Sequence, residues 1–495
     1  MIQSRRSFTA TLLLAIFLVA TFYTAARIGI LGPSYLKPPP VYYHHGDAAV
    51  GAGANTTTDT QDGFGATTQP PPKDPACAWM PDTSNILVVM KTGASESFSK
   101  VPTQLMTTLR CLPDYLIFSD MKQTIAGVEI RDSLDTVLEE AKKDNADFVL
   151  YNYQKACEVD LENCNKEGGD AAKAGWNLDK YKNIHIAEKT FGLRPNYDWY
   201  LFVDADTYVL WPNLVQWLKK FSPTNKHYFG SMTMVAQFPF GHGGSGYVVS
   251  KAAMREFAGR PGDESIANKW DPEIHKACCG DYMFAKALKE ATDVSVKNVW
   301  PTINGEKPYT LPFGPLHWCH PVVTMHHLNA EEVSSFWEYE RDFFQPRDNT
   351  RSLTTQRTLL LKDIYTHYFA PKMQGSREDW DNLSDDVFYL DRSRTDRKWD
   401  SFELERAKKG PMSQVERKAH KSFEDCRAMC EAVDACFQFL YQDGLCASSF
   451  SFKLGKPNRS EQSPAKRWRS GWIVPKINKW IERQGECKKP IWPSV

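Results

Sequence analysis

The segment that most constrains the fold of this chain is residues 198–209. Residues 199–203, Trp-Tyr-Leu-Phe-Val, predict a buried β-strand because all five are apolar or aromatic. Two carboxylates, Asp204 and Asp206, follow at its carboxyl end, and Pro212 then starts a helix. An Asp-x-Asp alone is typical of a solvated loop, but carboxylates at a sheet edge favour a partner such as Mg²⁺ or Mn²⁺. The segment predicts an α/β fold with a metal site at a strand end.

Upstream, strand-like and helix-like segments alternate. Residues 85–90 and 115–118 are apolar runs that predict strands, residues 99–112 have mixed helical spacing, and residues 134–143 predict a helix. This alternation predicts a parallel sheet, in which ligands bind outside the carboxyl ends of the strands. The residues that follow the two strands are therefore candidate nucleotide contacts, with plain loops as an equal alternative: Thr92, Gly93 and Asp120.

Further candidate site residues surround the acidic strand in the sequence. Residues 238–250 form a glycine-rich turn into a strand, and glycines permit close approach of the backbone to a ligand. Asp281 lies in the first turn of a predicted helix, where a helix N-cap is the alternative role. His326 and His327 are adjacent, with His320 nearby, and imidazoles are metal ligands as well as ordinary structural residues.

Aromatic and cationic residues extend this candidate list. Two lysines before the acidic strand could contact a diphosphate, although solvated lysines on an amphipathic helix are an equally good interpretation. Several aromatic rings could contact a nucleotide or an acceptor, or simply belong to the core. The candidate donor contacts are Trp176, Lys180, Lys182 and Asp204, and the candidate acceptor or substrate contacts are Gly243, Gly244, Tyr247, Trp300 and Trp318.

The N-terminus predicts the compartment. Residues 1–7 carry Arg5 and Arg6, and residues 8–31 contain an apolar run near the roughly 20 residues that span a bilayer. The arginines predict a cytoplasmic tail and a lumenal remainder, which is a type II topology. A cleaved signal peptide is the alternative. Residues 32–76 are rich in Pro, Gly, Ala and Thr and predict an extended stem.

Twelve cysteines fit an oxidising lumen, where they can pair as disulfides. Asn55, Asn382 and Asn458 each begin an Asn-x-Ser/Thr acceptor for glycosylation, which supports the topology weakly. Acidic and basic residues balance at 60 each, so nothing in the net charge indicates a nucleic-acid partner, which would demand a basic surface. The expected partners are therefore a membrane and non-nucleic-acid ligands.

The C-terminal third is different in character. Residues 346–421 are polar and predict an irregular connector, and residues 422–495 predict a small cysteine-rich module with strands at 436–441 and 446–450. A zinc site is the competing interpretation, but the lumen and the lack of well-placed histidines disfavour it. The module resembles PAN/Apple modules, and this resemblance implies that Cys430 pairs with Cys436 and Cys426 with Cys446.

Taken together, the motifs of residues 199–209 and 243–250, Asp281 and His326 resemble glycosyltransferase family 31, in particular its core 1 β1,3-galactosyltransferase-like branch. The resemblance covers about residues 85–345 and implies a catalytic domain at 77–345 with the GT-A type of nucleotide-binding α/β sandwich. It implies a UDP-sugar donor, Mn²⁺ held by Asp204, Asp206 and His326, and Asp281 as the catalytic base. Gly280 departs from the acidic pair that the family usually has before this helix.

The resemblance further implies a Golgi enzyme that transfers a hexose, galactose by preference, in β1,3 linkage with inversion onto a glycan or glycoprotein. General base catalysis by Asp281 would contribute roughly 10²- to 10⁴-fold in rate. The alternative is a membrane-tethered carbohydrate-binding or adhesion protein with an inactive domain. A glycoside hydrolase is disfavoured because it needs two carboxylates that flank a sugar bond.

Overall fold

The computed structural model describes residues 74–157, 159–167, 170–259, 262, 264–345, 357–459, 463 and 466–495. The expected tail and anchor, and the stem up to residue 73, lie outside this part of the chain. Among the described residues no helix combines the length and apolarity needed to cross a bilayer.

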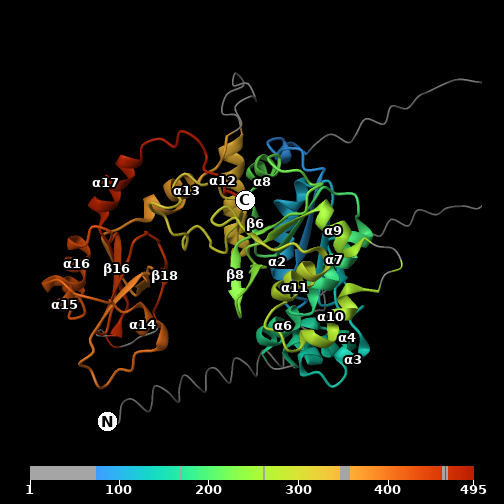
Figure 1. The fold of residues 1–495 in the computed structure, drawn as a ribbon, viewed down its shortest axis with the longest axis horizontal. Helices are drawn as coiled ribbons and strands as arrows, with labels where there is room; N and C mark the ends of the chain where they lie inside the picture. Colours follow the sequence, from blue (N-terminus) through green and yellow to red (C-terminus); the bar gives the residue numbers. More distant parts are fainter. Residues whose placement is uncertain are drawn as a thin grey trace, which may run out of the picture. The chain divides into compact units, whose positions relative to one another are not determined.

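A large mixed sheet forms the centre of the region up to α12 (Figure 1), as the alternating segments predict. In the described residues it has eight strands, in the order β11 (Lys297–Asn298), β7 (Tyr228–Gly230), β10 (Tyr247–Ser250), β5 (Trp199–Asp204), β1 (Ile86–Lys91), β2 (Tyr115–Ser119), β4 (Val128–Asp132) and β3 (Gln123–Ile125). Strands β5, β1, β2 and β4 are parallel, whereas β10 is antiparallel to β5. The α/β fold class is confirmed.

Both faces of this sheet are covered, which is why β1 and β5 are apolar at every position but the last. Leu87 and Val89 point into one core, and Ile86 and Val88 into the other. The helices of the first face are α4 (Val149–Ala156), α6 (Ala171–Asp179), α7 (Lys182–Leu193), α9 (Lys251–Ala258), α10 (Ile266–Ile274) and α11 (Gly280–Thr292), with α5 (Leu161–Glu167) beside α4. Those of the second are α2 (Ser97–Met106), η3 (Leu109–Cys111) and α8 (Trp211–Leu218).

One predicted helix is much shorter than expected. Residues 134–143 form turns followed by the short α3 (Glu139–Lys142). One reason is that Asp271 of α10 accepts a 2.8 Å hydrogen bond from the N–H of Leu138, which a helix over residues 134–143 would bond internally. Such competition cannot be read from apolar spacing.

Two small antiparallel pairs complete this region. After Asp206 the chain forms β6 (Tyr208–Val209), which pairs with β12 (Thr324–Met325). This pairing brings His326 beside Asp206, although the two are far apart in sequence. The second pair is the hairpin of β8 (Met232–Val235) and β9 (Phe238–Gly241).

The C-terminal part contains a five-stranded antiparallel sheet, counted over the described residues. Its order is β13 (Ser376–Glu378), β19 (Arg469–Trp472), β16 (Gln438–Gln442), β17 (Leu445–Ser449) and β15 (Val387–Leu390), with the further pair β14 (Trp380–Asp381) and β18 (Lys456–Pro457). Two of its strands, β13 and β15, come from the segment 346–421 for which the sequence predicts an irregular connector. The helices are α12 (Ala330–Phe344), α13 (Leu361–Ile364), α14 (Ser401–Arg406), α15 (Gln414–Lys418), α16 (Phe423–Ala432) and α17 (Val474–Gln484).

All twelve cysteines lie in the described residues, and each is paired. The pairs Cys426–Cys446 and Cys430–Cys436 are those implied by the module's resemblance, so a zinc site on these cysteines is excluded. The other pairs are Cys77–Cys111, Cys157–Cys164, Cys278–Cys279 and Cys319–Cys487.

One expected glycosylation site is wrong for the folded protein. The Asn382 side chain is buried, and its amide donates to the carbonyls of Phe439 and Gly471 at 3.0 and 3.3 Å. A glycan on this nitrogen would break both hydrogen bonds and open the module's core. The acceptor sequence at Asn382 therefore serves as a buried cross-link between strands.

Candidate functional site

A cleft of about 560 Å³ lies at the carboxyl ends of β1 and β5. The last residues of these parallel strands, Lys91 and Asp204, are paired in register, so both side chains reach the same edge of the sheet. The residues that line the cleft include most of the candidates: Thr92, Gly93, Trp176, Lys182, Asp204, Gly243, Gly244, Asp281 and His326. Candidate residues that span some 230 positions of the sequence thus lie in one cleft. This cleft is at the strand ends, where α/β sheets bind ligands.

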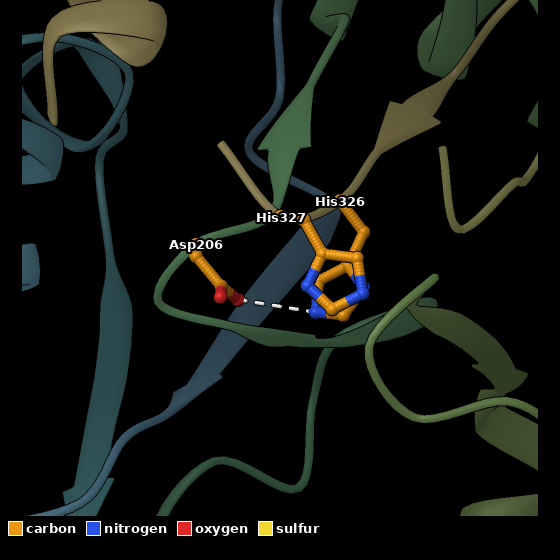
Figure 2. A group of neighbouring side chains, drawn as sticks. All are labelled: Asp206, His326 and His327. Carbon is orange, nitrogen blue, oxygen red and sulfur yellow. Dashed lines mark ion pairs between the residues drawn. The ribbon is translucent and has the colours of Figure 1, made fainter. Parts of the chain in front are cut away.

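A carboxylate oxygen and imidazole nitrogens form a compact cluster (Figure 2). Its two histidines line the cleft, whereas Asp206 contacts His326 without lining the cleft itself. Asp206, His326 and His327 offer ligand atoms that all lie within 4.8 Å of one another. The Asp206 Oδ1–His326 Nε2 distance is 3.2 Å, and Lys100 Nζ lies 3.1 Å from Asp206 Oδ2. Although burial raises the pKa of Asp206, His326 and Lys100 hold it far below its usual range. Asp206 is therefore an ionised ligand next to two imidazoles.

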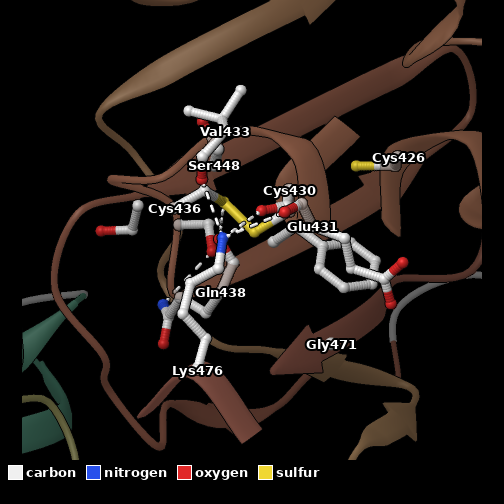
Figure 3. Close-up of a disulfide and its surroundings, with 12 residues drawn as sticks. Cys426, Cys430, Glu431, Val433, Cys436, Gln438, Ser448, Gly471 and Lys476 are labelled. Carbon is white, nitrogen blue, oxygen red and sulfur yellow. Dashed lines mark hydrogen bonds between the residues drawn. A yellow bond between two sulfur atoms is a disulfide. The ribbon is translucent and has the colours of Figure 1, made fainter. Parts of the chain in front are cut away.

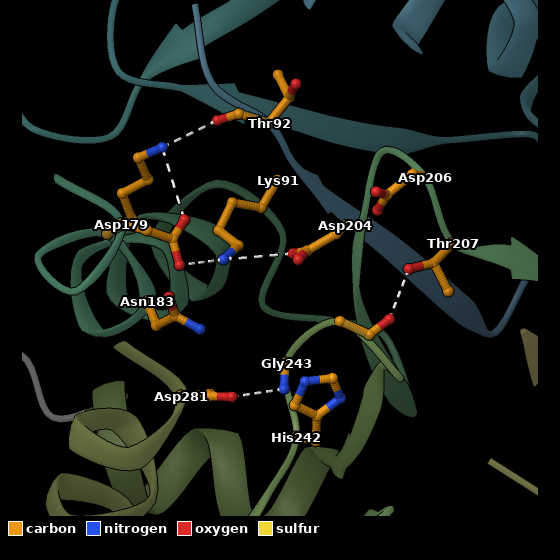
Figure 4. Close-up of polar contacts among 12 residues, drawn as sticks. Lys91, Thr92, Asp179, Asn183, Asp204, Asp206, Thr207, His242, Gly243 and Asp281 are labelled. Atoms are coloured by element: carbon orange, nitrogen blue, oxygen red, sulfur yellow. Dashed lines mark hydrogen bonds and ion pairs between the residues drawn. The ribbon is translucent and has the colours of Figure 1, made fainter. Parts of the chain in front are cut away.

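Asp204, the third predicted ligand, lies outside this cluster. Its Oδ1 is 3.3 Å from Lys91 Nζ, and Lys91 also binds Asp179 at 2.6 Å (Figure 4). Burial raises the pKa of Asp204, although Lys91 opposes this shift. Two of the three predicted ligands thus meet, together with His327, while Asp204 is held by a lysine.

The glycine-rich turn leaves space for the His326 ring. A Cβ on Gly244 would lie 2.2 Å from the His326 ring, closer than any side chain permits. The Gly244 carbonyl also accepts a 2.7 Å hydrogen bond from the Thr207 hydroxyl, which ties this turn to the residue after Asp206. Gly244 therefore packs against the metal-ligand candidates and fixes their arrangement.

Asp281 is held at the start of α11 by backbone donors. Its Oδ2 accepts from the N–H of Gly243 at 2.6 Å, and its Oδ1 from the N–H of Tyr282 at 2.8 Å. Sterics explain why the preceding residue, Gly280, has no side chain. A Cβ there would lie 2.5 Å from Asn183 Oδ1 and 2.7 Å from the carbonyl oxygen of Asp179. The acidic residue that the family usually has before this helix would not fit at position 280.

A network of buried charges supports the cleft. Lys182 is 2 % exposed and is ion-paired with the fully buried Asp120. Its Nζ also donates to the Thr92 carbonyl at 3.1 Å. Burial lowers the pKa of Lys182, but Asp120 and Asp179 raise it above its ordinary value, so the lysine stays charged. Lys182 and Asp120 thereby fix the loop after β1.

Some candidates lie away from the cleft. Lys180 pairs with Asp147 at 2.7 Å, and Tyr247 is a core residue stacked between Phe202 and Phe284. Trp318 is 6 % exposed and belongs to an apolar cluster with Trp337. The remaining candidate, Trp300, is 39 % exposed but does not line the cleft; its ring packs on His317. Asp120 supports the cleft without lining it.

Three residues of the site do not follow from the sequence reasoning: Lys91, Asp179 and His242. His327 is noted there as the neighbour of His326, and the structure adds it to the ligand candidates. A charge at the end of an apolar strand was an available signal for Lys91. His242 lies within the glycine-rich turn, where its Nδ1 is 2.8 Å from the Ser245 hydroxyl, and burial lowers its pKa. Asp179 carries no local signal, since it acts through residues that are distant in sequence.

Comparison with protein-family models identifies part of this region. Residues 143–292 match the family model described as Fringe, Fringe-like. The matched stretch contains β5, both acids that follow it, the glycine-rich turn and Asp281. It is a domain of the glycosyltransferase type. The match ends before His326 and begins after Lys91, so these two residues are added to the site by the structure and not by the comparison.

Proposed function

We propose that this chain is a metal-dependent, inverting glycosyltransferase of the GT-A type that transfers a hexose, galactose by preference, from a UDP-sugar to a glycan acceptor in β1,3 linkage. One observation carries the proposal: His326 and His327, which form a cluster with Asp206, line the same cleft as Asp204 at the end of β5 and Asp281 at the start of α11. The Fringe-like match supports the reaction class. The donor and the linkage rest on the family resemblance of the motifs.

The cluster fits a divalent cation of the Mn²⁺ kind. It offers one ionised carboxylate and two imidazoles within 4.8 Å, a mixed oxygen and nitrogen set that suits such an ion. Asp206, His326 and His327 would hold it. A bound ion supplies Lewis-acid stabilisation of the charge that develops on the departing diphosphate. Asp204 lies beside the cluster and remains a candidate ligand, in competition with Lys91.

The protein groups have separable roles in this proposal. Lys91 brings positive charge to the cleft wall where a diphosphate would lie, and Trp176, which is 63 % exposed there, offers a ring for stacking. Asp281 removes the proton from the acceptor hydroxyl as that oxygen attacks the anomeric carbon from the face opposite UDP. Its two backbone N–H donors keep it oriented while it acts. Inversion at the anomeric carbon follows from this geometry of attack.

We further propose a Golgi location with a type II anchor at residues 8–31. Arg5 and Arg6 before the apolar run support this orientation. The paired cysteines support an oxidising compartment.

A product assay tests the proposal. The purified lumenal part is incubated with a panel of UDP-sugars and 4-nitrophenyl glycosides in MnCl₂ or in EDTA, and UDP release and the glycoside product are measured. We expect transfer only with the metal, and none from Asp206→Ala despite an unchanged circular dichroism spectrum. Full activity of Asp206→Ala would refute the metal assignment. A wild-type protein that binds glycans but releases no UDP would favour the adhesion alternative.

A further inference from the structure

A disulfide between adjacent residues, Cys278–Cys279, directly precedes α11 and its Asp281. Cys278 is exposed and Cys279 is half-buried. Cys279 lines the same cleft as Asp281. The disulfide therefore reaches the cleft through Cys279, two residues from the proposed base, and Cys278 is exposed next to it.

We propose that the Cys278–Cys279 disulfide is a wall of the acceptor subsite, against which the acceptor sugar ring packs. The inference rests on the proposed function, in which Asp281 takes the proton of the acceptor hydroxyl. That hydroxyl must lie within hydrogen-bond reach of Asp281, so the ring that carries it must contact the cleft surface next to this carboxylate.

The position of Asp281 in the cleft separates this surface from the donor side. Figure 4 places Asp281 and Gly243 on one side of the Lys91–Asp204 pair and Thr92 on the other. The nucleotide is proposed to lie at the β1 end, near Thr92. The surface around Asp281 and Cys279 is then left for the acceptor.

The chemistry of this surface suits a sugar. Sugar rings have apolar C–H faces, and sulfur is soft and polarizable, so it packs well against them. The β8–β9 hairpin lines the same cleft with Thr233 and Phe240. Gly280 cannot carry a side chain, so Cys279 is the nearest preceding residue that presents one to the cleft beside Asp281. An apolar wall with one placed carboxylate is the usual composition of a small-ligand site.

A protection experiment on the wild-type protein tests the inference. The protein with UDP and MnCl₂ is treated with a mild phosphine reductant and N-ethylmaleimide, with or without 4-nitrophenyl glycosides of galactose, N-acetylgalactosamine, glucose and mannose. Peptide mass spectrometry follows labelling of Cys278 and Cys279. A glycoside at ten times its dissociation constant should slow this labelling about 10-fold. Labelling of Cys157 and Cys164, which form another local disulfide and lie outside the lining of the cleft, should not change.

A pair of variants gives an independent readout. Cys278→Ser/Cys279→Ser should raise the acceptor KM about 10-fold, as for loss of a small packing contact, while the donor KM and UDP affinity stay unchanged. Cys157→Ser/Cys164→Ser is the matched control and should alter neither KM. A wild-type acceptor KM in the first variant would overturn the inference; if that variant does not fold, the protection experiment decides.

The failures of the two proposals are distinguishable. A wild-type protein that binds UDP with Mn²⁺ but whose Cys278–Cys279 disulfide is protected by none of the glycosides overturns this inference alone. A protein that neither binds UDP nor cleaves a UDP-sugar overturns the proposed function, and the inference falls with it.

Discussion

The two main sheets of this protein are stabilised by different means. At the edge of the eight-stranded sheet, buried ions such as Lys182 and Asp120 are held by one another. The five-stranded sheet instead has neutral buried groups such as Asn382. Two disulfides hold this region together: Cys426–Cys446, and Cys430–Cys436, which Figure 3 shows. There Lys476 donates to the carbonyls of Cys430 and Val433 at 2.9 Å and satisfies the end of α16.

This difference indicates where function lies. Buried ion pairs contribute little net stability against apolar substitutes, so a sheet edge that concentrates them invites a functional explanation. Disulfides and neutral hydrogen bonds are sufficient to hold a small module together. Substitutions at the first sheet edge should therefore affect activity, whereas those in the C-terminal sheet should affect stability alone.

The largest effect is expected at the first sheet edge. Asp281→Asn keeps the shape of the side chain but removes the base, so kcat should fall about 10²- to 10⁴-fold. UDP affinity, measured by calorimetry, should stay that of the wild type. A kcat within a few-fold of wild type would show that another group takes the acceptor proton.

Lys182→Met tests how strongly the folded state depends on the buried Lys182–Asp120 ion pair. Loss of the lysine leaves Asp120 buried and unpaired, and the free energy of unfolding should fall by about 3 to 5 kcal/mol in denaturant titrations. Lys166→Met is the control, because its partner Glu162 is exposed and such pairs contribute about 0 to 1 kcal/mol. Equal losses in the two variants would remove the distinction between buried and surface pairs.

Cys426→Ala/Cys446→Ala tests how much this disulfide stabilises the C-terminal sheet. The bond closes a loop with a sequence separation of 20, so its loss should lower the free energy of unfolding by about 3 kcal/mol. UDP affinity should not change, because the disulfide lies outside the cleft. A loss of UDP binding in the folded variant would tie the module to the donor site.

The smallest effect concerns Glu340 on α12, which accepts a hydrogen bond from Tyr208 at 2.5 Å. Burial raises the pKa of Glu340 to about 8, above its ordinary 4.5. The folded state then holds a proton that the unfolded state releases, so the contribution of Glu340 to stability is fully present below pH 4.5 and is lost as the pH rises toward 8. Glu340→Gln should flatten this slope in pH-dependent unfolding measurements; an unchanged slope would mean that other groups cause it.

The sequence predicts much of the sheet and part of the site, for physical reasons. The apolar runs that became β1, β2 and β5 are long enough to be recognised, and the carboxyl ends of parallel strands necessarily meet. Glycine at 244 is also explicable, but only once His326 is known to lie against it.

What the sequence does not predict depends on contacts between distant segments. Asp179 enters the site by pairing with Lys91 from another element, and α3 is short because Asp271 takes a backbone N–H. Trp318 is a candidate by residue type alone, and aromatic type does not distinguish a cleft from a core.

The most direct test of the account is a calorimetric titration of UDP into the wild-type protein and into Asp206→Asn, with and without MnCl₂. We predict that the wild type takes up UDP only with manganese, and that the Asn variant binds it at least about 10-fold more weakly. UDP binding that is as tight without manganese, or as tight in the variant, would contradict the assignment of this cleft to a metal-held nucleotide.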